Sequence, residues 1–443
     1  MSHAKLSPEN TDSLQRVTFD YFVHETNPLN GLVVDKTMEG APASIAAVGL
    51  ALSAYPVGVE RGFITRADAI RRILVTLRFF RDSAQSVDAD ATGYKGFYYH
   101  FLDMNTGKRV WKCELSTVDS SFLFAGMLTA AAYFTGDSAE EREIRALADE
   151  LYGRADWQWA QNGGATVTHG WKPESGFLPY RWEGYDEAMF LYLLALGSPT
   201  YPLPAESYRA WTSTYEWRKI YDDEFLFAGP LFTHQISHIW VDFRGIQDEY
   251  MRGKGIDYFE NSRRATYAQQ KYAVLNPRKF DGYGEKCWGI TATDGPGEIT
   301  RKIRGEERRF FGYLARGVPD GPDDGSIAPW AVVASLPFAP EIVLPALRYF
   351  EDIKLHVSNP YGFKSTFNPT FSETSNPSQY WTSPWHYGLN QGPIVLVIEN
   401  FRSGLLWRLM RQCPYLVKGL RRAGFSGGWL GIEDNASKRE SKT

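Results

Sequence analysis

The chain has 443 residues, of which 43% are hydrophobic and 23% are charged, and its formal net charge is −4 at pH 7. These proportions are ordinary for a globular protein that buries a large core. A weakly acidic chain lacks the basic excess of nucleic-acid-binding proteins, so we expect no nucleic-acid partner.

Apolar residues recur at helical spacing along most of the chain. In 66–82 and 139–152 the aliphatic residues fall on one face, as in a helix packed against a core. Segment 117–134 is apolar almost all round, which predicts a helix buried on both sides, and Ser116 or Thr117 could cap it. Further predicted helices are, in chain order, 43–55, 186–196, 205–220, 230–240, 257–275, 326–336, 340–353 and 393–412.

Long segments rich in Gly, Pro, Trp and Asn separate these helices, and clear strand alternation is scarce. They are 161–185, 276–300, 316–329 and 358–392. Such lengths are unusual for structureless loops in a compact domain, so we expect them to be functional. Ten to twelve helices joined alternately by short turns and long loops predict an all-α toroid of helical hairpins with its cleft at the loop end. We expect one domain over 1–430, followed by a polar, frayed tail over 431–443.

Targeting signals are not visible. The first residues, MSHAKLSPENTDS, contain no apolar region typical of a signal peptide, and the longest apolar run, 394–398, is far too short to span a bilayer. The sequence therefore predicts a cytoplasmic protein as written, or a periplasmic or secreted one if a presequence has been removed.

Aromatic residues make up 15% of the chain, with 14 Trp, 25 Tyr and 27 Phe. Many of the Trp residues stand beside polar residues, an arrangement that suits the apolar faces and hydroxyl rims of sugars, although a large core also needs aromatic rings. Cys113, Cys287 and Cys413 are odd in number and widely spaced, which favours neither a disulfide framework nor a metal site.

Glu187 is the strongest candidate for catalysis. It lies in the aromatic stretch 169–198, directly before a fully apolar predicted helix. Among such neighbours a carboxyl group is desolvated, which raises its pKa and suits it to be a general acid. The alternative is a capping role, since acids are favoured in the first turn of a helix. Glu183 and Glu187 would share a face if the helix began early.

Glycoside hydrolysis usually needs a second carboxyl group from another part of the chain. Asp119 enters the apolar helix predicted at 117–134 and makes a plausible partner for Glu187, although it could simply be a first-turn acid. Glu114 and Asp242 are weaker candidates for the same role.

Metal and cofactor motifs are weak or absent. His234 and His238 have the i, i+4 spacing of a metal site but lack the glutamate of HExxH and an evident third ligand. GxGxxG and GxSxG are both missing, which argues against dinucleotide binding and serine hydrolysis. We therefore expect no metal and no cofactor.

Seven motifs, taken in order, resemble the glycoamylase-like family, which includes the bacterial endo-β-1,2-glucanases of glycoside hydrolase family 144. They are STVDSSFLFAG, HGWKPESGFLPYRWEGYDEA, HQISHIWVDFRG, ENSRRAT, YGEKCWGITATDGP, DGSIAPWAVVASLPF and QGPIVLVIEN, between about Ser116 and Trp407. The resemblance implies an (α/α)6 barrel, chemistry without metal, and action on β-1,2-glucan or a close relative. It also matches Glu187 to the acid of the family's W-x-x-Y-x-E motif and Asp119 to the acid of its T-V-D motif.

Two positions depart from the family pattern. Ser365 stands where relatives commonly have an Asp in G-F-x-D-x-F, and Gln391 stands where we expect an acid. Both changes leave the identity of the second carboxyl group, and the choice between inverting and retaining chemistry, open.

We therefore expect a glycoside hydrolase that cleaves β-linked glucan, most plausibly β-1,2-glucan. Two alternatives are a glucan transglycosylase on the same fold and a non-catalytic glucan-binding protein. The residues expected to contact sugar are Trp171, Arg181, Trp182, Tyr185, His238, Trp240, Arg244, Arg264, Trp288, Trp381, Trp385, His386, Asn390 and Gln391.

Overall fold

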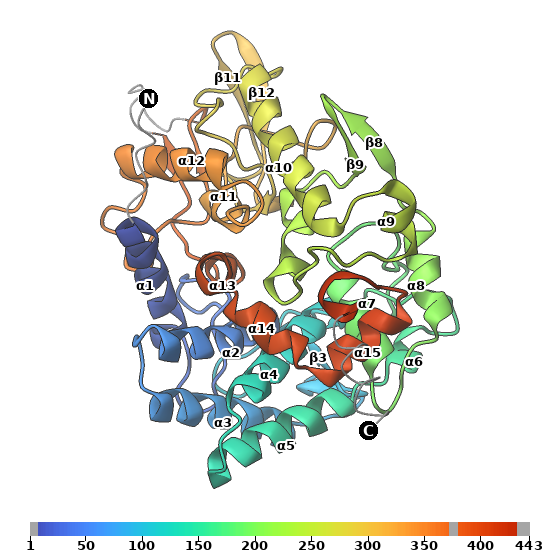
Figure 1. The fold of residues 1–443 in the computed structure, drawn as a ribbon. Coiled ribbons are helices and arrows are strands. Elements are labelled where there is room, and N and C mark those ends of the chain that lie inside the picture. The colour runs from blue at the N-terminus through green and yellow to red at the C-terminus, as the bar shows by residue number, and fades with distance from the viewer. Residues whose placement is uncertain (1–7, 372–379, 432–443) are drawn as a thin grey trace.

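The computed structural model describes residues 8–371 and 380–431 (Figure 1). Within these ranges the protein is rich in helices, and its strands are short. All but one residue of the tail expected to be frayed, 431–443, lies outside the described residues. In the described part of the chain, no helix combines the length and the apolar character needed to cross a bilayer.

Five helices are buried on nearly all sides, and their sequences are largely apolar. They are α2 (Ile45–Glu60), α4 (Thr117–Tyr133), α7 (Met189–Gly197), α11 (Pro329–Ala334) and α13 (Gly388–Ser403). In this group α2 packs on both α4 and α13, α4 packs on α7, and α11 packs on α13. Figure 1 shows α13 near the middle of the molecule.

Helices with one apolar face cover this inner group. They are α1 (Pro8–His24), α3 (Arg66–Asp82), α5 (Ala139–Gly153), α10 (Tyr258–Leu275), α12 (Pro340–Asp352) and α15 (Pro414–Arg422). The contacts pair inner with outer helices, since α1 packs on α13, α5 on α4, α15 on α7 and α12 on α11. One cluster of buried apolar side chains extends from Phe19 to Leu430.

The contact between α2 and α4 is unusually close. A Cβ atom on Gly49 would lie 2.1 Å from the carbonyl oxygen of Phe122, and one on Gly126 would lie 2.1 Å from the carbonyl oxygen of Gly49. Two glycines therefore let the two backbones touch, which fixes the middle of α4 against α2.

The strands are antiparallel pairs and one small sheet at the loop ends of the helices. The sheet has the order β2 (Gly93–Tyr94), β3 (Phe97–Tyr99), β5 (Leu115–Ser116), β6 (Gly170–Lys172), β7 (Gly176–Phe177). In its register Leu115 faces Trp171 and Ser116 faces Gly170. The pairs are β1 (Ala43–Ser44) with β4 (Phe101–Leu102), β8 (Trp217–Ile220) with β9 (Asp223–Leu226), β10 (Ala292–Thr293) with β13 (Leu314–Ala315), β11 (Ile299–Ile303) with β12 (Glu306–Phe310), and β14 (Phe367–Asn368) with β15 (Trp381–Thr382). The β11–β12 hairpin projects at the top of Figure 1.

Most predicted helices are confirmed within a few residues, and three differ. The helix expected at 205–220 ends at Thr212 as α8 (Ala205–Thr212), because 217–220 pairs as strand β8 instead. Segment 230–240 forms two short 3-10 turns, η1 (Leu231–His234) and η2 (Ile236–Ile239). The helix expected at 393–412 begins at Gly388 and breaks at Gly404, which has a φ of 67° and separates α13 from α14 (Leu405–Arg411).

Four helices were not predicted. They are α1, α15, α6 (Trp157–Ala160) and α9 (Glu249–Lys254). The last two are short, and α9 is bounded by an Asp248 cap and a left-handed Gly255 rather than marked by a long periodic pattern.

Candidate active site

The N-terminal ends of the inner helices meet at one cavity of about 470 Å³. Ser44 caps α2, Asp119 lies in the first turn of α4, and Glu187 precedes α7 by two residues. Trp330 is the second residue of α11, and Asn390 lies in the first turn of α13. Helix N-termini carry partial positive charge, so this convergence favours negative groups in the cavity. The side chains of three carboxylates, one imidazole and several rings line it: Asp35, Asp119, Glu187, His100, Phe101, Trp111, Phe122, Phe232, Tyr313, Trp330 and Tyr387.

Glu187 has the properties expected of a general acid. Burial raises the pKa of its carboxyl group to about 7, its own backbone N–H opposes that rise, and the negative charge of Asp119 adds to it. In the described part of the chain, no side chain of another residue hydrogen-bonds or ion-pairs with this carboxyl group. Its proton is therefore available to a ligand in the cavity.

Glu187 and Glu183 do not share a helical face, because α7 begins only at Met189. Glu183 is exposed and accepts a hydrogen bond from Thr166 Oγ1 at 2.8 Å. The two acids therefore have different surroundings, and only Glu187 lines the cavity.

Asp119 is both a first-turn acid and a cavity residue. Ser116 Oγ, which caps α4, donates to the Asp119 carboxylate at 2.5 Å, and the backbone N–H of Asp119 donates back to Ser116 Oγ at 3.2 Å. Ser116 belongs to β5, so the small sheet holds this carboxylate in place. Asp119 thus has the position of a first-turn acid and also a place in the cavity lining.

His100 joins Asp119 to Glu114. Its Nδ1 lies 2.8 Å from a carboxylate oxygen of Glu114 and 3.6 Å from one of Asp119. Burial disfavours charge on this ring, but Asp119, Glu114 and Asp35 raise the pKa of His100 to about 9. At neutral pH the imidazole is therefore positive and holds two carboxylates.

The same three side chains present ligand atoms within 4.8 Å of one another, a spacing that a metal ion could use. A metal ligand must be the neutral imidazole, however, and a ring with a pKa near 9 would have to lose its proton first. The ion-paired arrangement accounts for the cluster with the protein's own charges.

Asp35 is a cavity residue that the sequence did not reveal. It follows the apolar run of residues 32–34 and belongs to no helix or named strand. Burial raises the pKa of its carboxyl group to about 6, His100 and Lys36 oppose the rise, and Asp119 adds to it. An acid directly after an apolar run was the available signal, but many surface acids have that pattern.

Asp242 lies outside the cavity lining, in an ion-pair cluster. Arg244 donates two hydrogen bonds to its carboxylate, at 2.7 and 2.8 Å, and Arg411 donates a third. Burial acts against charge on this group, but these guanidinium groups hold the pKa of Asp242 below its ordinary value. Arg244 also lies 4.5 Å over the ring of Trp407, so both residues have structural partners.

Of the residues expected to contact sugar, Asn390 lines the cavity. Its side-chain oxygen accepts a hydrogen bond from Ser365 Oγ at 3.0 Å, and Ser365 Oγ lies 3.1 Å from Thr293 Oγ1. Ser365, at the position that departs from the family pattern, thus hydrogen-bonds to the cavity residue Asn390. The neighbouring Gln391 is buried and donates to the carbonyl of Phe363 at 3.4 Å.

Several predicted rings form the wall behind the cavity instead of its lining. Trp182 stacks on His169 with ring centroids 3.7 Å apart and donates to Thr117 Oγ1 at 3.0 Å. Trp240 is fully buried and donates to Ser53 Oγ at 3.0 Å.

Other predicted contacts lie in packed surroundings. Trp171 contacts Tyr94 and Trp159, Tyr185 contacts Tyr215, His234 and Tyr258, and Trp288 is fully buried. His238 packs between Phe243 and Phe338, and its Nε2 lies 3.0 Å from Ser262 Oγ. Arg181 donates hydrogen bonds to two backbone carbonyls. Arg264 forms an ion pair with Glu260. Trp381 and Trp385 are partly exposed outside the cavity lining, and His386 is buried against Tyr361.

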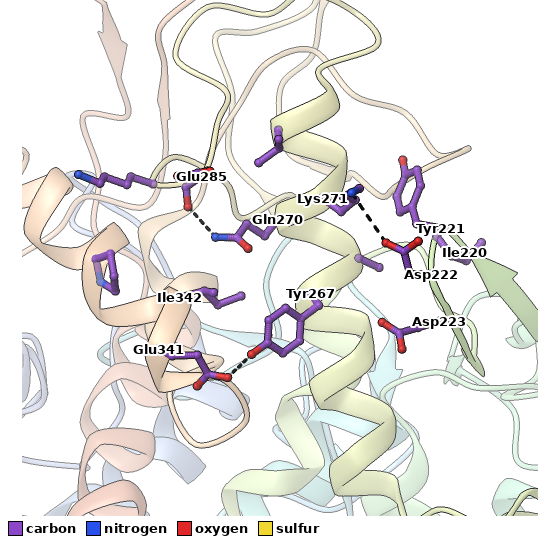
Figure 2. A pocket seen from close by; sticks show the side chains of 14 residues that line it. Ile220, Tyr221, Asp222, Asp223, Tyr267, Gln270, Lys271, Glu285, Glu341 and Ile342 are labelled. Carbon is purple, nitrogen blue, oxygen red and sulfur yellow. Dashed lines mark hydrogen bonds and ion pairs between the residues drawn. The ribbon is translucent and has the colours of Figure 1, made fainter. Parts of the chain in front are cut away.

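A larger hollow, of about 660 Å³, lies on the outside of the fold between α10, the β8–β9 turn and the start of α12 (Figure 2). Its polar groups pair with one another: Tyr267 donates to Glu341, Lys271 lies 3.8 Å from Asp222, and Gln270 donates to the backbone of Glu285. Because it contains none of the predicted catalytic carboxylates, the smaller cavity is the better candidate active site.

Comparison with known proteins places the site in context. Residues 179–414 match the Glycoamylase family model, described as "Putative glucoamylase". An exo beta-1,2-glucooligosaccharide sophorohydrolase of Parabacteroides distasonis is 30% identical over 93% of this chain. The chain spans 57% of the length of that relative.

Two solved structures are similar over nearly the whole chain. A Bacteroides uniformis protein described in the same words as the family is 34% identical, with a TM-score of 0.84 over 97% of this chain and 100% of its own. An endo-beta-1,2-glucanase of Chitinophaga pinensis, solved with sophorotriose and glucose, is 27% identical, with a TM-score of 0.82 over 95% of this chain and 99% of its own.

Proposed function

The chain belongs to the glycoamylase family, and from that membership we propose that it is a glycoside hydrolase that cleaves β-1,2-linked glucan. Two relatives named for that linkage support the substrate. The observation that carries the reaction type is a carboxyl group, Glu187, with a pKa near 7 in a cavity that holds other carboxylates and aromatic rings.

In this proposal Glu187 is the general acid. It donates its proton to the glucosidic oxygen as the bond to the anomeric carbon breaks, and a second carboxylate of the cavity activates the attacking water. Asp119 and Asp35 line the cavity and can fill that role, whereas Glu114 and Asp242 are bound to other side chains outside the lining. No step needs a metal ion.

Sugar would bind against the rings of Trp111, Tyr313, Trp330 and Tyr387, which line the same cavity. Aromatic rings suit the apolar faces of glucosyl units. Asn390 would hydrogen-bond a hydroxyl group, and the other predicted contact residues would support the cavity walls or bind sugar units that extend beyond it.

We also propose that the helices form a single (α/α)6 barrel over residues 1–430. The packing of α2, α4, α7, α11 and α13 inside a second group of helices supports this arrangement, with the turns η1 and η2 in the place of a sixth inner helix. The continuous core from Phe19 to Leu430 supports one domain.

The test is Glu187→Gln, which keeps the shape of the side chain and removes its proton. We expect the rate of β-1,2-glucan cleavage to fall about a hundredfold or more, as for the loss of a general acid. Glu183→Gln is the matched control, because Glu183 is a nearby acid outside the cavity, and we expect it to keep near-native kcat. Near-native turnover by Glu187→Gln in a folded protein would contradict the proposal.

A further inference from the structure

We propose that Asp35 is the carboxylate that activates the attacking water, opposite the acid Glu187. This inference rests on the proposed function and assigns the role that the sequence left open. It follows from comparing the surroundings of the carboxylates that line the cavity.

The backbone of Asp35 is fixed from three directions although it belongs to no regular element. Tyr21 Oη on α1 donates to the carbonyl oxygen of Asp35 at 3.2 Å, and the N–H of Gly388 at the start of α13 donates to the same oxygen at 2.9 Å. The N–H of Asp35 donates to the carbonyl of Pro42 at 2.7 Å. Two helices and the segment before α2 thus hold the residue, and a group that must meet a reacting water needs such rigid support.

The Asp35 carboxylate is also free to accept a proton. Within residues 8–371 and 380–431, no side chain hydrogen-bonds or ion-pairs with it, and it lines the cavity. Asp119, in contrast, accepts from Ser116 Oγ at 2.5 Å and faces His100 at 3.6 Å. Both of these contacts are to Asp119 Oδ2, which a hydroxyl group and an imidazolium therefore share. A base needs a lone pair that points to water, and within the described part of the chain neither carboxylate oxygen of Asp35 is engaged in this way.

The charges near Asp35 keep it ionised when the enzyme works. The groups that act on its pKa are His100 and Lys36, which lower it, and Asp119, which raises it together with burial. Lys36 is itself held 5.3 Å over the ring of Tyr387. With a pKa near 6, Asp35 is mostly a carboxylate at neutral pH and is a stronger base than an exposed aspartate.

Asp119 acts on the pKa of both Glu187 and Asp35, so it lies within electrostatic reach of each.

In the reaction a water proton moves to Asp35 while the water oxygen bonds to the anomeric carbon. The bond from that carbon to the glucosidic oxygen breaks, and the proton of Glu187 moves to that oxygen. Exchange with solvent restores both groups, and because water attacks directly, the new hemiacetal has the inverted, α configuration.

The experiment compares wild type, Asp35→Asn, Asp35→Ala and Asp119→Asn on β-1,2-glucooligosaccharides. We expect Asp35→Asn to lower kcat about a hundredfold or more with little change in KM. We expect azide to restore turnover of Asp35→Ala, with an α-glycosyl azide as product, because azide is an anionic nucleophile that attacks in place of water and needs no base to activate it. Azide cannot repair a merely structural defect. Asp119→Asn should show no such rescue.

A second measurement uses only the wild-type enzyme. NMR identifies the anomeric configuration of the reducing end that is formed first. An α anomer supports the assignment. A β anomer, or turnover by Asp35→Asn within tenfold of wild type, would overturn it while leaving the proposed function standing. A wild-type protein that binds but never cleaves the oligosaccharides would overturn both.

Discussion

Glu187 and Asp35 both line the cavity, and in the proposed mechanism they work in opposite protonation states. Burial raises the pKa of both, to about 7 and about 6 respectively. The acid must keep its proton, so activity falls as the pH rises through about 7. The base must lose its proton, so activity falls as the pH drops through about 6. We therefore expect a narrow bell-shaped profile of kcat/KM with its maximum between pH 6 and 7.

The measurement is kcat/KM from pH 4 to 9, with circular dichroism at each pH to confirm that the protein stays folded. Asp119 raises the pKa of both groups, whereas His100 lowers that of Asp35, so a change at Asp119 should shift both limbs. A profile that stays flat down to pH 4 would show that no group with a pKa near 6 has to be ionised.

The raised pKa of Glu187 also predicts an effect on stability. A carboxyl group whose pKa is higher in the folded state than in the unfolded state favours folding at low pH, and this contribution is lost as the pH rises through the folded-state value. Here the window runs from the ordinary value of 4.5 to about 7. Above it, Glu187→Gln should raise the free energy of unfolding by up to about 3 kcal/mol, since one pKa unit corresponds to about 1.4 kcal/mol.

Urea unfolding of both proteins at pH 5 and pH 8.5 tests this. The gain should be clear at pH 8.5 and much smaller at pH 5, and a lower midpoint for the variant at pH 8.5 would contradict it. Glu183→Gln serves again as the control, because Glu183 is exposed.

The sequence singled out Glu187 and Asp119 because each stands directly before or in an apolar helix, and both line the cavity. Their catalytic roles stay predictions. Asp35 and His100 could not be found in this way. Their roles depend on partners far along the chain, such as Gly388 for Asp35 and Asp119 for His100. The reverse also occurs, since Trp182 and Trp240 were predicted to contact sugar but are buried outside the cavity lining. Polar neighbours in sequence do not prevent a ring from being buried.

At the scale of elements, the loop that brings Tyr313 into the cavity depends on a buried ion pair. Arg316 and Asp324 are both fully buried, and Arg316 donates to the two carboxylate oxygens at 2.7 and 2.8 Å. Arg316 also donates to the carbonyls of Thr293 and Gly312, and Asp324 accepts from the N–H of Phe311. The pair therefore closes the loop on which Tyr313 stands, and Tyr313 lines the cavity with 55% of the residue exposed.

We expect Arg316→Lys to lower the free energy of unfolding by about 3–5 kcal/mol, because a lysine cannot replace the forked guanidinium and leaves buried groups unpaired. If the variant folds, KM should rise more than kcat falls, since Tyr313 would be displaced. Arg309→Lys is the control. Its ion pair with Glu298 on the β11–β12 hairpin is exposed, so its effect should stay within about 1 kcal/mol. Equal stability for Arg316→Lys and wild type would show that the pair does not hold the loop.

Helices were easier to predict than the segments between them. Apolar periodicity predicted the bounds of α3, α4, α5 and α10 almost to the residue. The reason is that three of them have one clear apolar face and α4 is apolar nearly all round. The long loops contain strands of only two to five residues, too short for alternation to be visible. Segment 205–220 was misassigned because strand β8 is defined by its pairing with β9, not by its own pattern.

The fold places the N-terminal ends of several inner helices at the cavity, and this arrangement suits a site that carries carboxylates. The cap of α2 and the first turns of α4, α11 and α13 contribute to its lining. Partial positive charge at the helix ends offsets part of the desolvation free energy of the three buried acids. The positive charge of His100 offsets a further part of it. The sequence predicted the loop end of a helical toroid as the place of the cleft, but the convergence itself depends on long-range packing.

At this scale the last prediction concerns the linkage. We expect β-1,2-glucan to be cleaved well before cellulose, laminarin or starch, since relatives that are 30% and 27% identical over nearly all of this chain are named for β-1,2-linked substrates. We expect a glucan of another linkage to present its glucosidic oxygen to Glu187 from a different direction. Reducing-end release should be measured at equal concentrations of the four glucans, with Glu187→Gln as the blank and products resolved by length. Ser365 makes this a demanding test, because it replaces an acid of the family pattern and contacts Asn390 at the cavity. Turnover of another glucan with none of β-1,2-glucan would show that this substitution accompanies a change of substrate within the same fold.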